Sequence, residues 1–275
     1  MKNSIVIDGV DIYKEYGVVV LSNINKVALT PPEVIELTSV EWYEGGISVD
    51  NTERREFETT RKISFDCVQY KVELYGKLLE FLKSTPYHTI GFQQLGIEKT
   101  LRLSMVSSSK LLSGHYIQEF TMTFTDDAED ITQFIYSAQL TAVKNNFGDS
   151  LTINNTNFDK YGFTLLEGSL DDIFSQNMND RVKDAKHSVT NKIQEITLSV
   201  GCSGVSIETF VGNYYSLLRE LTKEGWITIK GRYLDVYVTL EGWYKSINIS
   251  EIYANNSEIF CKFDIGFNAV KVDIG

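Results

Sequence analysis

The pattern of apolar and polar positions at the start of the chain recurs in its middle. Residues 7–23 read IDGVDIYKEYGVVVLSN, and residues 153–169 read INNTNFDKYGFTLLEGS. Each stretch predicts a short strand, a polar turn and a second strand of alternating apolar residues. Gly17 and Gly162 each follow a tyrosine and indicate a bulge or a close approach of the backbone. The chain therefore opens twice in the same way.

A second match lies further along each half. Residues 71–83, KVELYGKLLEFLK, align with residues 210–222, FVGNYYSLLRELT. The shared apolar positions have helical spacing and predict one amphipathic helix per copy. They are Val72, Tyr75, Leu78, Leu79 and Leu82 in the first copy, and Val211, Tyr214, Leu217, Leu218 and Leu221 in the second. Ser206 is a candidate N-cap, Gly225 follows the second helix, and Pro86 follows the first.

Strands flank both helices in the same order. Alternating strands precede them, with Ile63, Phe65 and Cys67 in one copy and Ile196, Leu198 and Val200 in the other. Short strands follow, and each copy closes with an alternating strand, 116–124 or 258–267. We expect an α+β, mainly β protein of two tandem domains, each a small β-sandwich or barrel with one α-helix and a long protruding hairpin. The expected divisions are 1–128, a linker at 129–149, and 150–275, which suits the usual size of domains.

Each copy also carries a long two-stranded excursion between its opening and its helix, at residues 28–67 and 168–200. In the first, alternating apolar residues lead to Glu44-Gly45-Gly46 and return through Phe57 to Phe65. A hairpin of this length overshoots the core of its domain and has exposed edges that invite a partner. The residues that we predict at a subunit interface are Trp42, Arg54, Arg55, Glu56, Phe57 and Glu58.

Composition and charge narrow the classes of protein. The apolar fraction is 43%, with 15 Phe and 15 Tyr, as in a folded globular protein. No stretch approaches the ~20 apolar residues of a membrane span, and MKNSIVIDGV predicts a strand rather than a signal peptide. The net charge of −11 is spread along the chain and repels nucleic acid. The acidic residues belong either to a solvated surface or to the lining of a channel through which DNA slides.

The sequence shows few residue patterns that are typical of catalytic or metal-binding sites. Cys67, Cys202 and Cys261 form no C-x-x-C pair and are expected to be reduced core thiols. His88, His115 and His187 are expected in three separate loops, without the spacing of a zinc site. No nucleophile motif is present. We therefore predict no catalytic, cofactor-binding or metal-ligating residue, and no enzyme.

Three further motifs favour structural roles. The stretch 201–204, GCSG, resembles a phosphate-cradling turn but lacks a lysine, so we expect a loop. The acidic residues Asp126, Asp127, Glu129 and Asp130 lack calcium-site spacing and predict a solvated linker. The repeated Glu-Gly-Trp at 224–226 and 241–243 predicts two turns, each with a tryptophan that anchors the sheet.

The chain resembles the tail tube, distal-tail (Dit-like) and tail hub proteins of long-tailed bacteriophages, of the kind found in phages or prophages of gut-type Bacteroidetes hosts. The openings IVIDGVDIYKEYGVVVL and LTINNTNFDKYGFTLLEGSLDDI resemble the strand-turn-strand start of such proteins. ALTPPEVIELTSVEW and KIQEITLSVGCSGVSIETFVGNYYSLLRELTKEGWITI resemble their following elements. Many distal-tail proteins pair one tube-like domain with a carbohydrate-module-like domain, whereas both halves of this chain resemble the tube domain.

The resemblance implies a virion component at the distal end of the tail, assembled in the bacterial cytoplasm. Tails of this kind are built from six-fold rings, so three copies of a doubled chain complete a pseudo-six-fold ring. We favour this trimer over a hexamer. The helices would pack outside, the sheets would line a lumen for DNA that is not specifically bound, and the tips at 44–56 and 176–190 would reach neighbouring subunits. Other tail proteins would be partners, and a membrane would not.

Other classes of function stay open at this point. The chain could be the tail tube protein proper, or a tube or hub component of a phage-derived secretion system. A carbohydrate-binding adhesin module would expose Trp42, Trp226 and Trp243 with tyrosines as a stacking platform. A hydrolase would require a pocket with convergent carboxylates or histidines.

Overall fold

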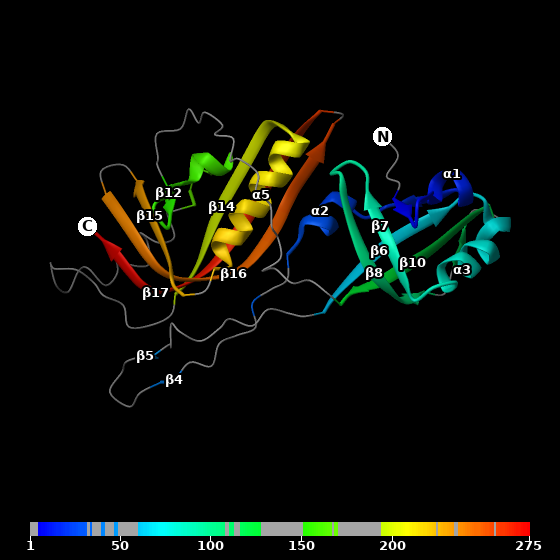
Figure 1. Cartoon of the computed structure of the whole chain (residues 1–275), viewed down its shortest axis with the longest axis horizontal. Coiled ribbons are helices and arrows are strands. Elements are labelled where there is room, and N and C mark those ends of the chain that lie inside the picture. The colour runs from blue at the N-terminus through cyan, green and yellow to red at the C-terminus, as the bar shows by residue number, and fades with distance from the viewer. Residues whose placement is uncertain are drawn as a thin grey trace. The chain divides into compact units, whose positions relative to one another are not determined.

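The chain forms two compact units, each described here by itself (Figure 1). One unit contains Met1–Thr30 and Thr59–Glu129, and the other contains Pro31–Glu58 and Asp130–Gly275. The computed structural model describes residues 5–31, 34, 40–41, 47–48, 60–107, 110–112, 116–127, 151–166, 168–169, 194–223, 225–233, 236–255 and 257–275. Among these residues, no helix combines the length and apolar character that crossing a membrane requires.

The first unit is one curled antiparallel sheet with short helices. The order along the sheet is β2-β1-β7-β8-β10-β6-β3, and β9 also pairs with β10. Its strands are β1 (Val6–Ile7), β2 (Val10–Asp11), β3 (Val18–Val20), β6 (Arg61–Gln69), β7 (Tyr87–Phe92), β8 (Ile97–Val106), β9 (Lys110–Leu112) and β10 (Ile117–Asp126). Its helices are α1 (Ile12–Tyr16), α2 (Ile24–Leu29), the 3-10 turn η1 (Val72–Leu74) and α3 (Tyr75–Lys83).

The second unit repeats this plan. Its sheet has the order β12-β11-β15-β16-β17-β14-β13, in which every strand has a counterpart in the first sheet. The strands are β11 (Leu151–Ile153), β12 (Thr156–Asn157), β13 (Thr164–Leu165), β14 (Gln194–Ser206), β15 (Ile227–Tyr233), β16 (Val236–Ala254) and β17 (Glu258–Ile274). The 3-10 turn η4 (Phe158–Tyr161) and α5 (Ile207–Leu221) complete it, and α5 crosses the face of β14, β16 and β17 (Figure 1). The expected two tandem, mainly β domains are confirmed, each as a single curled sheet with one principal helix.

The long helix of each unit packs on its sheet through the same aromatic pair. Tyr75 of α3 meets Phe120 of β10 edge to face, with ring centroids 5.4 Å apart. Tyr214 of α5 meets Phe263 of β17 in the same way at 5.7 Å. Edge-to-face pairs contribute beyond the area that they bury. The predicted N-cap is confirmed, because the Ser206 side chain accepts a hydrogen bond from the Thr209 backbone N–H.

A polar pair is also repeated, with its two partners exchanged. In the first unit the Thr121 hydroxyl of β10 donates to Asp66 of β6 across 2.9 Å. At the corresponding places in the second unit, the Ser199 hydroxyl of β14 donates to Asp264 of β17 across 2.6 Å. Both pairs are directly opposite in their ladders. The donor and the acceptor have changed strands, while the cross-strand hydrogen bond is present in both units.

The opening segments differ from the expected strand-turn-strand. A short helix, α1 or η4, stands where the second strand was predicted to begin. The Asp11 side chain caps α1 by accepting from the backbone N–H groups of the next turn, and Gly17 ends it with φ +70°. Gly162 ends η4 with φ +73°. The predicted bulge at these glycines is therefore wrong, but the predicted close approach is right for Gly17, where a Cβ would lie 2.7 Å from Lys71 Cγ.

Three other local predictions are corrected. The 201–204 stretch is no loop: it lies in β14, where the register against β17 shifts between Cys202 and Val205. His88 lies on β7 rather than in a loop. Gly242 and Trp243 lie within β16 rather than in a turn, although Trp243 is buried and anchors the sheet as predicted.

Candidate functional site

The first excursion contributes a two-stranded sheet to the second unit. β4 (Val40–Glu41) pairs antiparallel with β5 (Ile47–Ser48), and the two strands come before and after the tip predicted at 44–46. The six residues predicted at a subunit interface, Trp42, Arg54, Arg55, Glu56, Phe57 and Glu58, lie outside the described residues. The contacts that the structure describes for this excursion are made by residues before and after these six.

One flank attaches directly to the edge of a sheet. The Val34 backbone N–H donates to the Lys245 carbonyl of β16 across 3.2 Å. Among the described strands, none pairs with this edge of β16 at Lys245, because the pairing of β15 with β16 ends at Gly242. A segment that follows the first opening thus adds to the sheet of the second unit by a backbone hydrogen bond.

The receiving residue has a counterpart in the first unit. Lys245 is the extra residue of a bulge in β16, since both of its chain neighbours have partners on β17 and it has none. Ser104 is the extra residue of a bulge in β8 in the same position against β10. The two bulges lie next to equivalent ladder positions, Phe267 in the second unit and Phe124 in the first. Bulges re-aim a strand and mark places where pairing changes.

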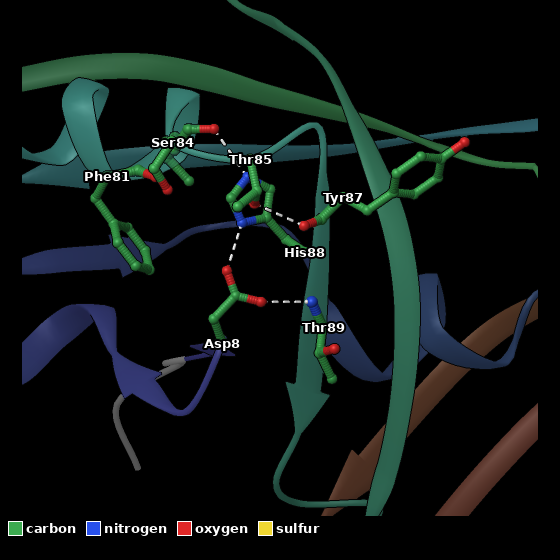
Figure 2. Close-up of polar contacts among 8 residues, drawn as sticks. Asp8, Phe81, Ser84, Thr85, Tyr87, His88 and Thr89 are labelled. Atoms are coloured by element: carbon green, nitrogen blue, oxygen red, sulfur yellow. Dashed lines mark hydrogen bonds and ion pairs between the residues drawn. The ribbon is translucent and has the colours of Figure 1, made fainter.

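A buried histidine lies within a polar cluster of the first unit (Figure 2). His88 is fully buried, and its Nδ1 lies 2.6 Å from Asp8 Oδ2. Its Nε2 lies 2.8 Å from the Leu82 carbonyl at the end of α3, and a carbonyl can only accept. The other oxygen of Asp8 accepts from the Thr89 N–H across 2.7 Å. Both ring nitrogens are occupied inside the protein, so His88 has no free nitrogen to offer a substrate.

The second unit contains a cluster of the same design. Asn154 has φ +47° where Asp8 has φ +50°. Its backbone N–H donates to the Thr228 carbonyl, and its side-chain oxygen accepts from the Thr228 N–H, at 2.8 and 2.9 Å. The Asn154 amide then donates to Glu220 on the last turn of α5 across 2.9 Å. In both units a left-handed turn residue joins the opening to a strand and a helix end, which is a structural role.

The acidic cluster at the end of β10 is also engaged. Asp126 is buried, and its Oδ2 lies 3.4 Å from Lys99 Nζ. Asp127 receives two hydrogen bonds from the Arg102 guanidinium, at 2.6 and 2.9 Å. Hydrogen bonding from Arg102 lowers the pKa of the Asp127 carboxyl, and the same contact raises the pKa of Arg102. The prediction of a solvated linker is therefore wrong for these two residues, while Glu129 and Asp130 lie outside the described residues.

The thiols are buried and free, as the sequence predicted. Cys202 and Cys261 are directly opposite on β14 and β17. Burial raises the pKa of the Cys202 thiol to about 12 and raises that of Cys67 and Cys261 further. A thiol in this state is a poor nucleophile. Within the described ranges, no three His, Cys, Asp or Glu side chains are grouped so that they could hold a metal ion.

The two tryptophans that the structure describes do not form an exposed stacking platform. Trp243 is only 4% exposed, and Trp226 is 39% exposed. Trp42 lies outside the described residues. The features that recur in both units are thus edges, bulges and packing contacts.

Comparison of the chain with protein-family models, with curated proteins and with solved structures gives no match.

Proposed function

We propose that this chain is a structural virion protein that forms a ring at the distal end of a bacteriophage tail, as the adaptor that joins the tail tube to the baseplate or tip. The observation that carries the proposal is the doubled unit, with one strand order in both sheets. The repeated aromatic pair, the exchanged polar pair and the matching bulges support a true duplication. The resemblance of the openings and helices to tail tube and distal-tail proteins supports the tail.

A duplicated unit suits a ring for a geometric reason. Identical units that associate head to tail about one axis close into a cyclic assembly. If each unit takes one place in a six-fold ring, three chains complete it with true three-fold symmetry. Such a ring can join a six-fold tube to a three-fold tip. The net charge of −11 suits a lumen through which DNA moves without binding.

The described polar groups are compatible with a structural rather than an enzymatic role. His88 is enclosed between Asp8 and Leu82, and the thiols are buried. These contacts stabilise the two units and present no reactive group to solvent.

Solution mass and electron microscopy test the proposal. Multi-angle light scattering across protein concentrations is expected to give three times the 31.2 kDa of one chain, and negative-stain images are expected to show six-lobed rings. A tail tube protein proper, or the tube of a phage-derived secretion system, would instead stack such rings into long tubes. A strict monomer at high concentration, with no rings in the images, would contradict the proposal.

A further inference from the structure

We propose that Cys202 and Cys261 are a site of covalent modification, where a cross-strand disulfide forms when the protein meets a small-molecule disulfide such as glutathione disulfide. Both cysteines belong to the sheet of the second unit, Cys202 to β14 and Cys261 to its neighbour β17. The bond would fasten the end of β14 to β17. This inference concerns the single chain, so it stands or falls independently of the proposed ring.

The backbone register brings the two cysteines to a distance that a disulfide can span. Cys202 and Cys261 are direct partners in the antiparallel ladder of β14 and β17. Residues in this relation have Cα atoms about 4.5 or about 5.5 Å apart, depending on the type of pair. Both separations fall within the roughly 4.4–6.8 Å range of disulfides. Directly opposite side chains also lie on the same face of the sheet, so the bond requires no change of register.

Both side chains lie in the core of the second unit. Cys261 is fully buried and Cys202 is 8% exposed. Burial raises the pKa of the Cys261 thiol, and the charged form of Cys202 raises this pKa further. Burial also raises the pKa of the Cys202 thiol, while a hydrogen bond from the Cys261 backbone acts in the opposite direction. The two residues therefore interact through their polar groups as well as by position.

The first unit has another matched pair at the same place. Counted along the ladders from the exchanged polar pair, the position of Cys202 and Cys261 corresponds to that of Gln69 and Gln118. Both glutamines are buried as well. Each repeat thus places two like side chains opposite each other here, and only the pair in the second unit can become covalently joined.

The ladder is interrupted beside the site. Its register shifts between Cys202 and Val205, and the intervening Ser203 and Gly204 are exposed. At such a bulge the strand can adjust its path and open locally. Because a buried thiol is a poor nucleophile, the reaction takes place through these openings or while the chain folds. The pair therefore stays as two thiols in a reducing cytoplasm and becomes a disulfide in an oxidising medium.

The reaction is a thiol–disulfide exchange in two steps. The Cys202 thiolate attacks one sulfur of glutathione disulfide, whose S–S bond breaks and releases one glutathione thiolate. The Cys261 thiolate then attacks the Cys202 sulfur of this mixed disulfide, forms the bond between the two cysteines and releases the second glutathione thiolate. The two glutathione thiolates take up the two protons that the cysteines lost. Two electrons pass from the protein to glutathione disulfide.

Cell-free synthesis of the full-length protein tests the site, because the chain then folds in a chosen redox buffer. One sample contains reduced glutathione and the other an excess of glutathione disulfide. Both are then denatured, labelled with N-ethylmaleimide and analysed by mass spectrometry. All three cysteines are expected to be labelled in the reduced sample, and only Cys67 in the oxidised one, since Cys67 lies opposite Phe120 and Val20. Cys202 and Cys261 are expected in one disulfide-linked pair of peptides.

Oxidation of the denatured chain is the control for chance pairing. There, loop length alone favours this pair over the two pairings with Cys67 by only about three- to six-fold. The folded sample is expected to contain this pair and no other. Three labelled cysteines in both samples, glutathione adducts in place of the linked peptides, or no greater preference than in denaturant would overturn the inference.

A matched pair of variants provides a second measurement. Tryptophan fluorescence follows the second unit, to which all three tryptophans belong. In the wild type, oxidation is expected to raise the Tm of this transition by roughly 5–15 °C, because the cross-link closes a loop of the unfolded chain. Cys67→Ala, which removes an equally buried thiol, is expected to keep this rise, and Cys202→Ala to lose it. Equal Tm values for the oxidised and reduced wild type, or a rise that persists in Cys202→Ala, would overturn the assignment.

Discussion

Replacing Asp8 tests whether the histidine cluster stabilises the first unit. The Asp8 carboxylate accepts from the Thr89 N–H and contacts His88 Nδ1, and it does so from a backbone with φ +50° (Figure 2). Asp8→Ala removes both contacts and leaves the buried imidazole with one partner. It also places alanine in a left-handed conformation that aspartate tolerates better.

The magnitude follows from these contacts. Each hydrogen bond to a charged group contributes about 1.5–3 kcal/mol. Because the Asp8 side chain is 34% exposed, water replaces part of what is lost. We therefore expect Asp8→Ala to lower the free energy of unfolding of the first unit by about 2–4 kcal/mol. For a unit of this size, that loss corresponds to a fall in Tm of roughly 10–20 °C.

Asp8→Asn is the matched control, since asparagine stands at the equivalent position 154. It tolerates the left-handed turn and can still accept from the Thr89 N–H. His88 can keep its Nε2 proton on the Leu82 carbonyl while Nδ1 accepts from the new amide. The expected loss is below about 1 kcal/mol, because both hydrogen bonds are replaced rather than removed.

Two spectroscopic signals separate the units in this experiment. All three tryptophans belong to the unit that contains residues 31–58 and 130–275, so tryptophan fluorescence follows that unit, while far-ultraviolet circular dichroism follows both. Asp8→Ala is expected to move the circular dichroism transition to lower temperature and to leave the fluorescence transition in place. The reasoning is refuted if Asp8→Ala unfolds like the wild type, or if Asp8→Asn is equally costly.

Three other predictions concern the backbone, the thiols and acid stability. Gly242→Ala would place a Cβ 1.9 Å from the Asn268 carbonyl oxygen and is expected to destabilise the second unit by about 1–3 kcal/mol or more. Gly76→Ala, on the open face of α3, is expected to stabilise the first unit by about 0.5–1 kcal/mol. Thermal unfolding measures both effects, and a Gly242→Ala protein as stable as the wild type would contradict the packing argument. A thiol reagent at pH 8 is expected to modify all three cysteines in denaturant and none of them in the folded protein, since burial raises the pKa of each thiol. Rapid labelling of the folded protein would contradict this prediction and show that the core opens. Arg102 lowers the pKa of Asp127 from 3.8, so this pair contributes stability above that pH and the contribution is lost as the pH falls through the lowered pKa. In acid titrations followed by circular dichroism, Asp127→Asn is therefore expected to lose stability less steeply below pH ~4 than the wild type. An equally steep loss of stability in both proteins would argue against the pair.

Local periodicity was sufficient wherever an element has one regular buried face. The alternation of Ile63, Phe65 and Cys67 predicted β6, and all three side chains are buried. The helical spacing of Leu217 and Leu221 predicted α5, which buries both. In each case one repeated interval decides which side of the element faces the core.

Prediction was weaker where the pattern is interrupted. β17 extends to 17 residues, well beyond the expected 258–267, and β16 extends to 19 residues where a short strand was expected. Bulges such as the one at Lys245 add single residues and reverse the alternation, so the pattern along the sequence breaks although the strand continues. The five-residue helix α1 is too short to show a helical period and was missed, although the Asp11 cap was available as a signal.

The apolar intervals alone predicted a doubled, mainly β chain, because duplication leaves the same intervals in both halves and these intervals set the order of strands and helix. Which side chains meet is visible only in the folded chain. Asp8 and His88 are 80 residues apart, and Val34 is more than 200 residues from Lys245. Such contacts depend on the register of distant strands, which no local interval records.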